Sequence, residues 1–194
     1  GALPLRRLTH SQYDHIVRDI FGDQTGPSSR FPPEDFVNGF KNQREAQSVS
    51  PVLATAYTAS AERVARNALR GGDRQNLIPC TPASAVDRDC AEKFIRKLGL
   101  RLFRRPMERN ETESYAGLFL ARAATVNSFE AGAAHVIEAM LQSPHFLYVV
   151  ERGPAGGAAQ YEIAARLALL FWDTAPDEEL LNRAGRGELS NASQ

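Results

Sequence analysis

Two cysteines stand ten positions apart, Cys80 and Cys90, in the polar segment CTPASAVDRDC. Such a pair can form a disulfide, remain as two free thiols or belong to a metal site. Zinc needs four ligands, and neither a CxxC motif nor a nearby histidine pair supplies the other two. A catalytic thiol needs a base that the sequence does not place beside it. The spacing therefore favours a structural disulfide, which would indicate an oxidising compartment, periplasmic or extracellular.

The chain has four histidines, His10, His15, His135 and His145. A haem or metal site would need at least one or two of them to converge. His145, in the segment SPHFLY, is the best candidate for a functional histidine, either as an axial ligand or as a proton carrier. The plainer alternative is a helix-end histidine that bonds a carbonyl. We predict no metal site in this chain.

A strongly basic segment runs from Arg88 to Arg109 and holds eight lysines or arginines against three acidic residues. Aromatic side chains that would stack on bases are not interleaved with the basic residues on their side of the helix, so a protein partner is favoured over nucleic acid. A solvated helix face would show the same pattern. The candidate partner-binding residues are Arg96, Lys97, Arg101, Arg104 and Arg105.

The segment FPPEDFVNGFKNQ, residues 31–43, mixes aromatic, proline, acidic and amide residues. Asp35, Asn38 and Asn42 offer oxygen ligands for calcium, but the alternating ligand spacing of an EF-hand is absent. The favoured interpretation is a structural wedge, in which the phenylalanines enter the core and the prolines stiffen the loop. Contact with a partner is the third interpretation. The phenylalanines are Phe31, Phe36 and Phe40.

Composition excludes several classes of protein. The chain has 23 lysines and arginines and 23 aspartates and glutamates, so its formal net charge is zero. No net positive charge therefore attracts it to nucleic acid. The longest apolar stretch, IAARLALLFW, is about half of the roughly 20 residues that span a bilayer, so we expect no transmembrane segment. We expect that any secretory signal has been removed or lay upstream. GxSxG, SxxK, HExxH, GxGxxG and Walker motifs are absent, so the catalytic residues, if any, are unknown.

Apolar residues recur at helical spacing in most of the chain, and no alternating strand pattern is found. Residues 23–49 show neither the 3.6-residue period of a helix nor the two-residue period of a strand. They therefore predict a long ordered loop. SPHFLYVVE fits either a short helix or an extended link. In YEIAARLALLFW, Ile163, Leu167, Leu170 and Phe171 fall on one side of a helix. The expected fold is all-α, an irregular array of about six or seven helices with one long ordered loop.

Five stretches in this order resemble a known series of domains: LRRLTHSQYDHIVRDIFG, FPPEDFVNGFKNQREAQSVSP, CAEKFIRKLGLRLFRRPMERNE, EAMLQSPHFLYVVE and ARLALLFWDTAPDEELLNRAGRGEL. The series consists of consecutive domains of unknown function (DUF1587, DUF1595 and the start of DUF1592). It is found in large secreted proteins, mostly planctomycete and myxobacterial, that often carry a cytochrome c module. The resemblance implies a periplasmic redox setting.

The resemblance and the linkers suggest three domains. Residues 1–72 would form an N-terminal helical domain with the long Phe/Pro loop. Residues 73–153 would form a disulfide-stapled basic domain, and residues 154–194 the start of a third, truncated domain. The chain would then be a fragment, a processed piece or one subunit of something larger. It has no CxxCH motif, so it cannot attach haem in the c-type manner, and we expect haem only in a partner domain or subunit.

Two functions follow as hypotheses. The first is an extracytoplasmic scaffold or interaction module of a larger cytochrome-c-associated protein. Its partner would be the remainder of the same polypeptide or a cytochrome-type subunit. The second is part of a composite periplasmic oxidoreductase in electron transfer, whose active site is completed by other segments, with His145 and Arg104 or Arg105 near that site.

Overall fold

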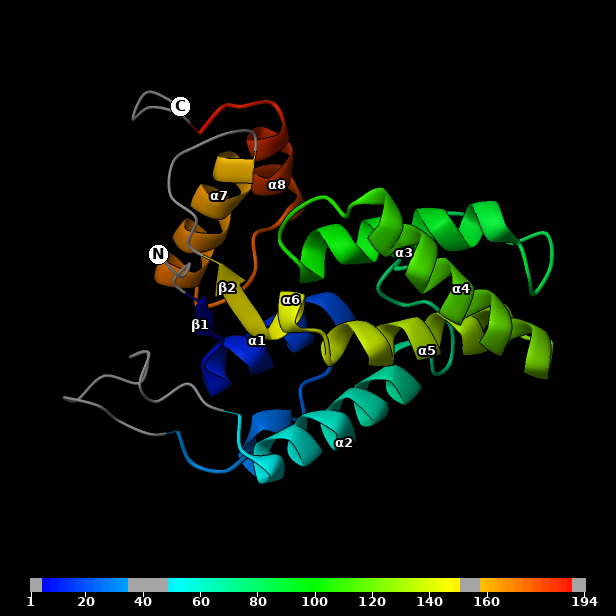
Figure 1. The fold of residues 1–194 in the computed structure, drawn as a ribbon, viewed down its shortest axis with the longest axis horizontal. Coiled ribbons are helices and arrows are strands. Elements are labelled where there is room, and N and C mark those ends of the chain that lie inside the picture. Colours follow the sequence, from blue (N-terminus) through cyan, green and yellow to red (C-terminus); the bar gives the residue numbers. More distant parts are fainter. Residues whose placement is uncertain (1–4, 35–48, 151–157, 190–194) are drawn as a thin grey trace.

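The structure, a computed structural model, describes residues 5–34, 49–150 and 158–189 (Figure 1). Within these ranges the regular secondary structure is helical except for one small sheet, which confirms the predicted all-α class. The helices are α1 (His10–Phe21), the 3-10 helix η1 (Pro27–Arg30), α2 (Pro51–Ala68), α3 (Arg88–Leu102), α4 (Arg109–Val126), α5 (Phe129–Leu141), α6 (Pro144–Leu147), α7 (Ala158–Phe171) and α8 (Glu178–Gly185).

Local capping signals set the helix starts. The Thr9 hydroxyl accepts a hydrogen bond from the Gln12 amide, and the Gln12 side chain accepts one from the Thr9 amide, both at 3.2 Å. This capping box begins α1, and Gly22, with a φ of 72°, ends it in the left-handed conformation. Ser50 caps α2 in the same manner by accepting from the Leu53 amide. These ends depend on residues within one helical turn.

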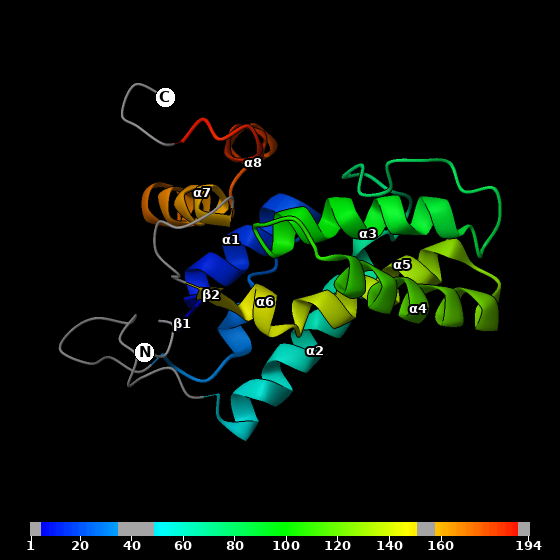
Figure 2. The ribbon, with the colours of Figure 1, turned by 45° about the horizontal axis from the view of Figure 1, so that its top comes forward.

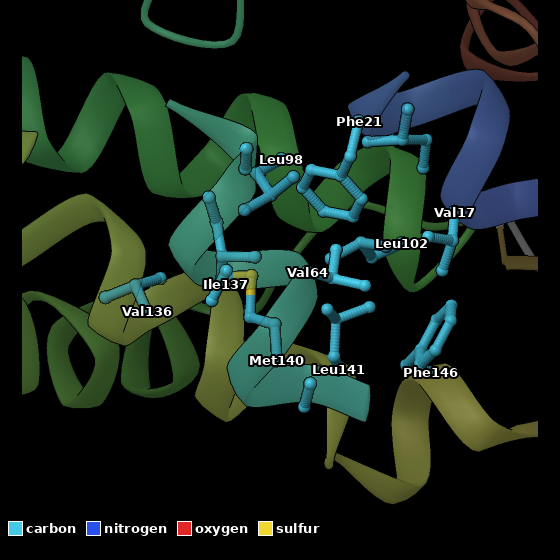
Figure 3. Packing of buried hydrophobic residues seen from close by; sticks show 14 of the residues in the cluster. Val17, Phe21, Val64, Leu98, Leu102, Val136, Ile137, Met140, Leu141 and Phe146 are labelled. Carbon is cyan, nitrogen blue, oxygen red and sulfur yellow. The ribbon is translucent and has the colours of Figure 1, made fainter. Parts of the chain in front are cut away.

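One hydrophobic core joins the helices from α1 to α6. Side chains from α1, α2, α3, α5 and α6 point into it together (Figure 3). Helix α5 packs against α2, α3 and α4, and Ile137, Met140 and Leu141 on it are fully buried. This core continues across the predicted boundary between residues 1–72 and 73–153. The three-domain division itself stays a prediction.

Gly132 on α5 allows the close approach of α4. A Cβ at this position would lie 2.7 Å from the Phe119 ring and 2.9 Å from the Phe119 carbonyl oxygen. Gly117 on α4 is a matched control, because a Cβ there would meet nothing within 4 Å.

We expect Gly132→Ala to lower the free energy of unfolding by about 1–3 kcal/mol, because overpacking displaces α4 from α5. Gly117→Ala should raise it by about 0.5–1 kcal/mol, because alanine loses less backbone freedom in a helix. Urea unfolding followed by circular dichroism measures both. Equal effects of the two substitutions would contradict the close approach.

The expectation that the chain has no strands is wrong at one place. Strand β1 (Leu5–Arg7) pairs antiparallel with β2 (Tyr148–Val150), with Leu5 opposite Val150 and Arg7 opposite Tyr148. A strand of three residues is too short to show an alternating pattern. The segment SPHFLYVVE therefore contains both of its predicted alternatives, the short helix α6 and then an extended strand. With α6, the described residues form eight α-helices, where about six or seven were expected.

Phe31 acts as the predicted wedge. Its side chain is 8% exposed, and its ring centroid lies 5.1 Å from that of Tyr13 and 4.9 Å from that of Tyr57. It therefore ties the chain after η1 to α1 and α2. The other members of this prediction lie outside the described residues: Phe36 and Phe40, and the calcium candidates Asp35, Asn38 and Asn42.

Helices α7 and α8 lie on the α1 side of the molecule, away from α4 and α5 (Figures 1 and 2). They pack against each other. Three side chains of α1 bond the end of α7 and the turn after it. Gln12 donates to the Leu169 carbonyl at 3.4 Å, His15 Nδ1 lies 3.2 Å from the Asp173 carboxylate, and Asp19 accepts from the Thr174 hydroxyl at 2.7 Å. These bonds fix the end of α7 on α1.

Candidate functional site

The Cys80–Cys90 disulfide is present, with a Cα–Cα distance of 5.8 Å. It links the segment after α2 to the first turn of α3. Asp87 caps the same turn by accepting from the Cys90 amide at 3.0 Å and from the Ala83 amide at 2.9 Å. These backbone hydrogen bonds lower the pKa of Asp87. The disulfide and the cap together fix where α3 begins.

Arg104 is buried, so its prediction as a partner-binding residue is wrong. Helix α3 ends at Leu102, and Arg104 adopts a left-handed φ of 58°, with its residue only 4% exposed. Helical spacing predicted that the Arg104 side chain points outward. That spacing does not apply to Arg104, because the residue lies two positions after the end of α3.

The Arg104 guanidinium donates to four carbonyl oxygens. Nη1 donates to Leu102 at 2.9 Å. Nη2 donates to His145, Phe146 and Tyr148 at 3.0, 3.1 and 2.8 Å. Burial lowers its pKa to about 9, so the group still carries its charge at neutral pH. Arg104 thereby joins the end of α3 to α6 and β2.

Arg105, Glu111 and His145 form a surface cluster beside this buried arginine. Arg105 donates two hydrogen bonds to the Glu111 carboxylate, at 2.9 and 2.7 Å. Glu111 Oε1 also lies 3.3 Å from His145 Nε2, and Arg105 Nη2 lies 3.3 Å from His145 Nδ1. The hydrogen bonds from Arg105 lower the pKa of Glu111. The structure thus brings His145 and Arg105 together at the surface.

A pocket with a volume of about 390 Å³ adjoins this cluster. Glu111, Tyr115 and His145 line it together with Ser114 and Leu118. The Glu111 carboxylate is already bonded by Arg105 and by the Glu108 amide, so it orients His145 more readily than it accepts a proton. His145 is the more exposed of the two side chains, at 48% against 15% for Glu111. The functional role of His145 stays a prediction.

The remaining candidates on the basic segment are already bonded within the chain. Arg96 pairs with Glu92 at 2.7 Å. Lys97 donates to the Asn76 carbonyl, and the half-buried Arg101 donates to the Asp19 carbonyl at 3.2 Å. An acidic partner would have to compete with these contacts. Their role in partner binding stays a prediction.

Helix α7 and the residue after it carry an exposed apolar surface. Leu170, Phe171 and Trp172 are 76%, 70% and 60% exposed, and Leu167 beside them is 36% exposed. We call these four residues the α7 apolar surface. The buried side of the helix is instead formed mainly by alanines, with one leucine: Ala164, Ala165, Ala168 and Leu169. The apolar side recognised from the sequence therefore faces outward.

The described ranges contain neither a metal-holding group of side chains nor a membrane-spanning helix. In residues 5–34, 49–150 and 158–189, no three histidine, cysteine or acidic side chains come together in a way that could hold a metal ion. Among the helices of the same ranges, none combines the length and the apolar character that crossing a membrane requires.

Three family models match the chain in consecutive order. Residues 6–70 match the family described as a protein of unknown function (DUF1587), residues 90–151 match DUF1595, and residues 159–194 match DUF1592, both with the same description. No curated protein and no solved structure matches the chain. The chain therefore belongs to the proteins of unknown function in which DUF1587, DUF1595 and DUF1592 follow one another.

Proposed function

We propose that this chain is a non-catalytic scaffold or interaction module of a larger extracytoplasmic protein, and that it docks a further protein domain through the α7 apolar surface. The single observation that carries this proposal is the exposure of Leu170, Phe171 and Trp172. Contiguous exposed apolar side chains of this size are typical of interaction sites. Phenylalanine and tryptophan are also enriched in the buried centres of protein interfaces.

The α7 apolar surface is held in place before any partner arrives. The bonds from Gln12, His15 and Asp19 fix the end of the helix on α1. Docking on a fixed surface loses less conformational freedom than docking on a mobile one. A protein partner fits better than a small molecule, because the surface projects outward on a helix and is not enclosed.

The cell compartment and the partner class rest on further observations. The Cys80–Cys90 disulfide supports an oxidising compartment, periplasmic or extracellular. The resemblance to secreted proteins with cytochrome c modules supports a partner in the same polypeptide or a cytochrome-type subunit. Haem would then belong to that partner.

Site-specific photo-crosslinking in the source organism tests this function. A photoreactive phenylalanine analogue replaces Phe171 in the natural protein, and the matched control replaces Val126, an exposed apolar residue at the far end of α4. We expect an adduct at position 171 with one defined peptide of the same assembly, and no such adduct at position 126. Absence of an adduct at 171, or the same adducts at both positions, would overturn the proposal.

Part of a composite periplasmic oxidoreductase is the second candidate function. It is favoured by the contact of Arg105, Glu111 and His145 beside a pocket of about 390 Å³. Visible absorption spectra of the oxidised and dithionite-reduced native assembly separate the two functions. A Soret band whose reduced form shifts in a His145→Ala variant favours the second, and an unchanged spectrum favours the scaffold.

A further inference from the structure

A separate pocket lies between η1 and α2, with a volume of about 410 Å³. This size falls within the range of roughly 300–1,000 Å³ typical of small-molecule sites. Its apolar wall includes Pro27, Val52, Ala56 and Ala59, and its two cationic residues are Arg30 and Arg63. No acidic residue is among its lining residues in the described ranges. The pocket therefore combines an apolar wall with positive charge.

The other polar side chains of the pocket are already bonded. The Ser60 hydroxyl lies 3.0 Å from the Tyr13 hydroxyl, and the Thr55 hydroxyl donates to the Pro51 carbonyl at 3.0 Å. The guanidinium groups are therefore the polar groups that remain for a bound molecule.

Arg63 has an unsatisfied hydrogen-bond donor. Its Nε is buried and has no hydrogen-bond partner among the described residues. Burying a donor without an acceptor costs free energy, and arginine side chains elsewhere in the fold avoid this cost. Arg104, for example, donates to four carbonyl oxygens. The Nε of the half-buried Arg63 thus lacks an acceptor among the described residues, and a bound anion would supply one.

The second cation is held in position by α1. Both oxygens of the Asp14 carboxylate accept from Ser28 in η1, at 2.8 Å from its amide and at 2.6 Å from its hydroxyl. These bonds fix η1, and with it the backbone of Arg30. No ion pair joins Arg30 to an acidic side chain in the described ranges.

We propose that the pocket between η1 and α2 binds a small monocarboxylate with an apolar body, its carboxylate on Arg63 and Arg30 and its apolar part on Val52, Ala56 and Ala59. A guanidinium matches a carboxylate because its parallel N–H groups donate to both oxygens. An inorganic anion would leave the apolar wall unused, and an alcohol would leave the guanidinium groups without an anionic acceptor. This site is independent of the α7 apolar surface.

Isothermal titration with octanoate tests the site, with 1-octanol and inorganic phosphate as comparison ligands. We expect octanoate to bind the wild-type protein at least about tenfold more tightly than either comparison ligand, because only octanoate uses both features of the pocket. Arg63→Met should weaken octanoate binding by about tenfold or more. The control Arg66→Met, one turn along α2 and outside this pocket, should leave binding unchanged.

Arg63→Met is not expected to unfold the protein, because the substitution removes a buried donor that has no acceptor. Arg30→Met, at an exposed position, provides a second variant with the same expected direction. Nuclear Overhauser contacts between octanoate and the Val52 methyl groups give a readout on the wild type alone. Absence of octanoate binding at millimolar concentration, equal binding of octanol or phosphate, or unchanged binding in Arg63→Met would overturn the proposal.

Discussion

Replacing Arg104 with methionine is expected to lower the free energy of unfolding by about 3–5 kcal/mol. The substitution keeps much of the side-chain volume but removes donors to four carbonyl oxygens. Those oxygens belong to Leu102, His145, Phe146 and Tyr148, and they would be left without this donor. Urea unfolding followed by circular dichroism gives the difference from the wild type.

Arg105→Met is the matched control for Arg104→Met. It changes the neighbouring residue, whose ion pair with Glu111 is partly exposed. The pair is bidentate, but water still reaches it, so we expect a loss of about 1–2 kcal/mol, smaller than that for Arg104→Met. Similar effects of the two substitutions would show that water replaces the Arg104 guanidinium at the four carbonyls.

Removing the disulfide is the second substitution expected to have a large effect. The double variant Cys80→Ala and Cys90→Ala should lower the free energy of unfolding by about 2–3 kcal/mol. The crosslink reduces the conformational entropy of the unfolded chain. Because the loop that it closes is short, its stabilisation is smaller than that of a disulfide closing a long loop. Urea unfolding of the variant and of the wild type measures it.

Reduction of the wild-type protein provides the control for the disulfide. The reduced protein should unfold at the same urea concentration as the double alanine variant, because both lack the crosslink. Thiol titration of the denatured native protein, with air oxidation blocked, should detect no free thiol. Two free thiols would remove the main argument for an oxidising compartment.

Much of the helical fold is encoded locally. The capping box of Thr9 and Gln12 and the Ser50 cap are formed by residues three positions apart. Their hydrogen bonds form within one turn of helix, so sequence spacing alone predicts them. The pairing of Cys80 with Cys90 was also favoured by the sequence, because these are its two cysteines and they lie in one short segment.

The candidate sites were predictable only in part. The sequence indicated His145 and Arg105, and the structure places them in contact. It did not indicate Glu111, whose position between them depends on how α4 follows the end of α3. The pocket at Arg63 gave no signal in the sequence, because an arginine on a helix is ordinarily solvated and the pocket forms only where η1 lies beside α2.

The sequence by itself determined the helical class and the capped starts of α1 and α2, and it favoured the disulfide, because these depend on groups close together along the chain. Tertiary structure alone decided that Arg104 turns inward and that Leu170 and Phe171 face outward. The acceptors of Arg104 lie up to 44 residues away, and the buried side of α7 is the one that fits against its neighbours. Periodicity identifies the sides of a helix, whereas contacts distant in sequence decide which side is buried.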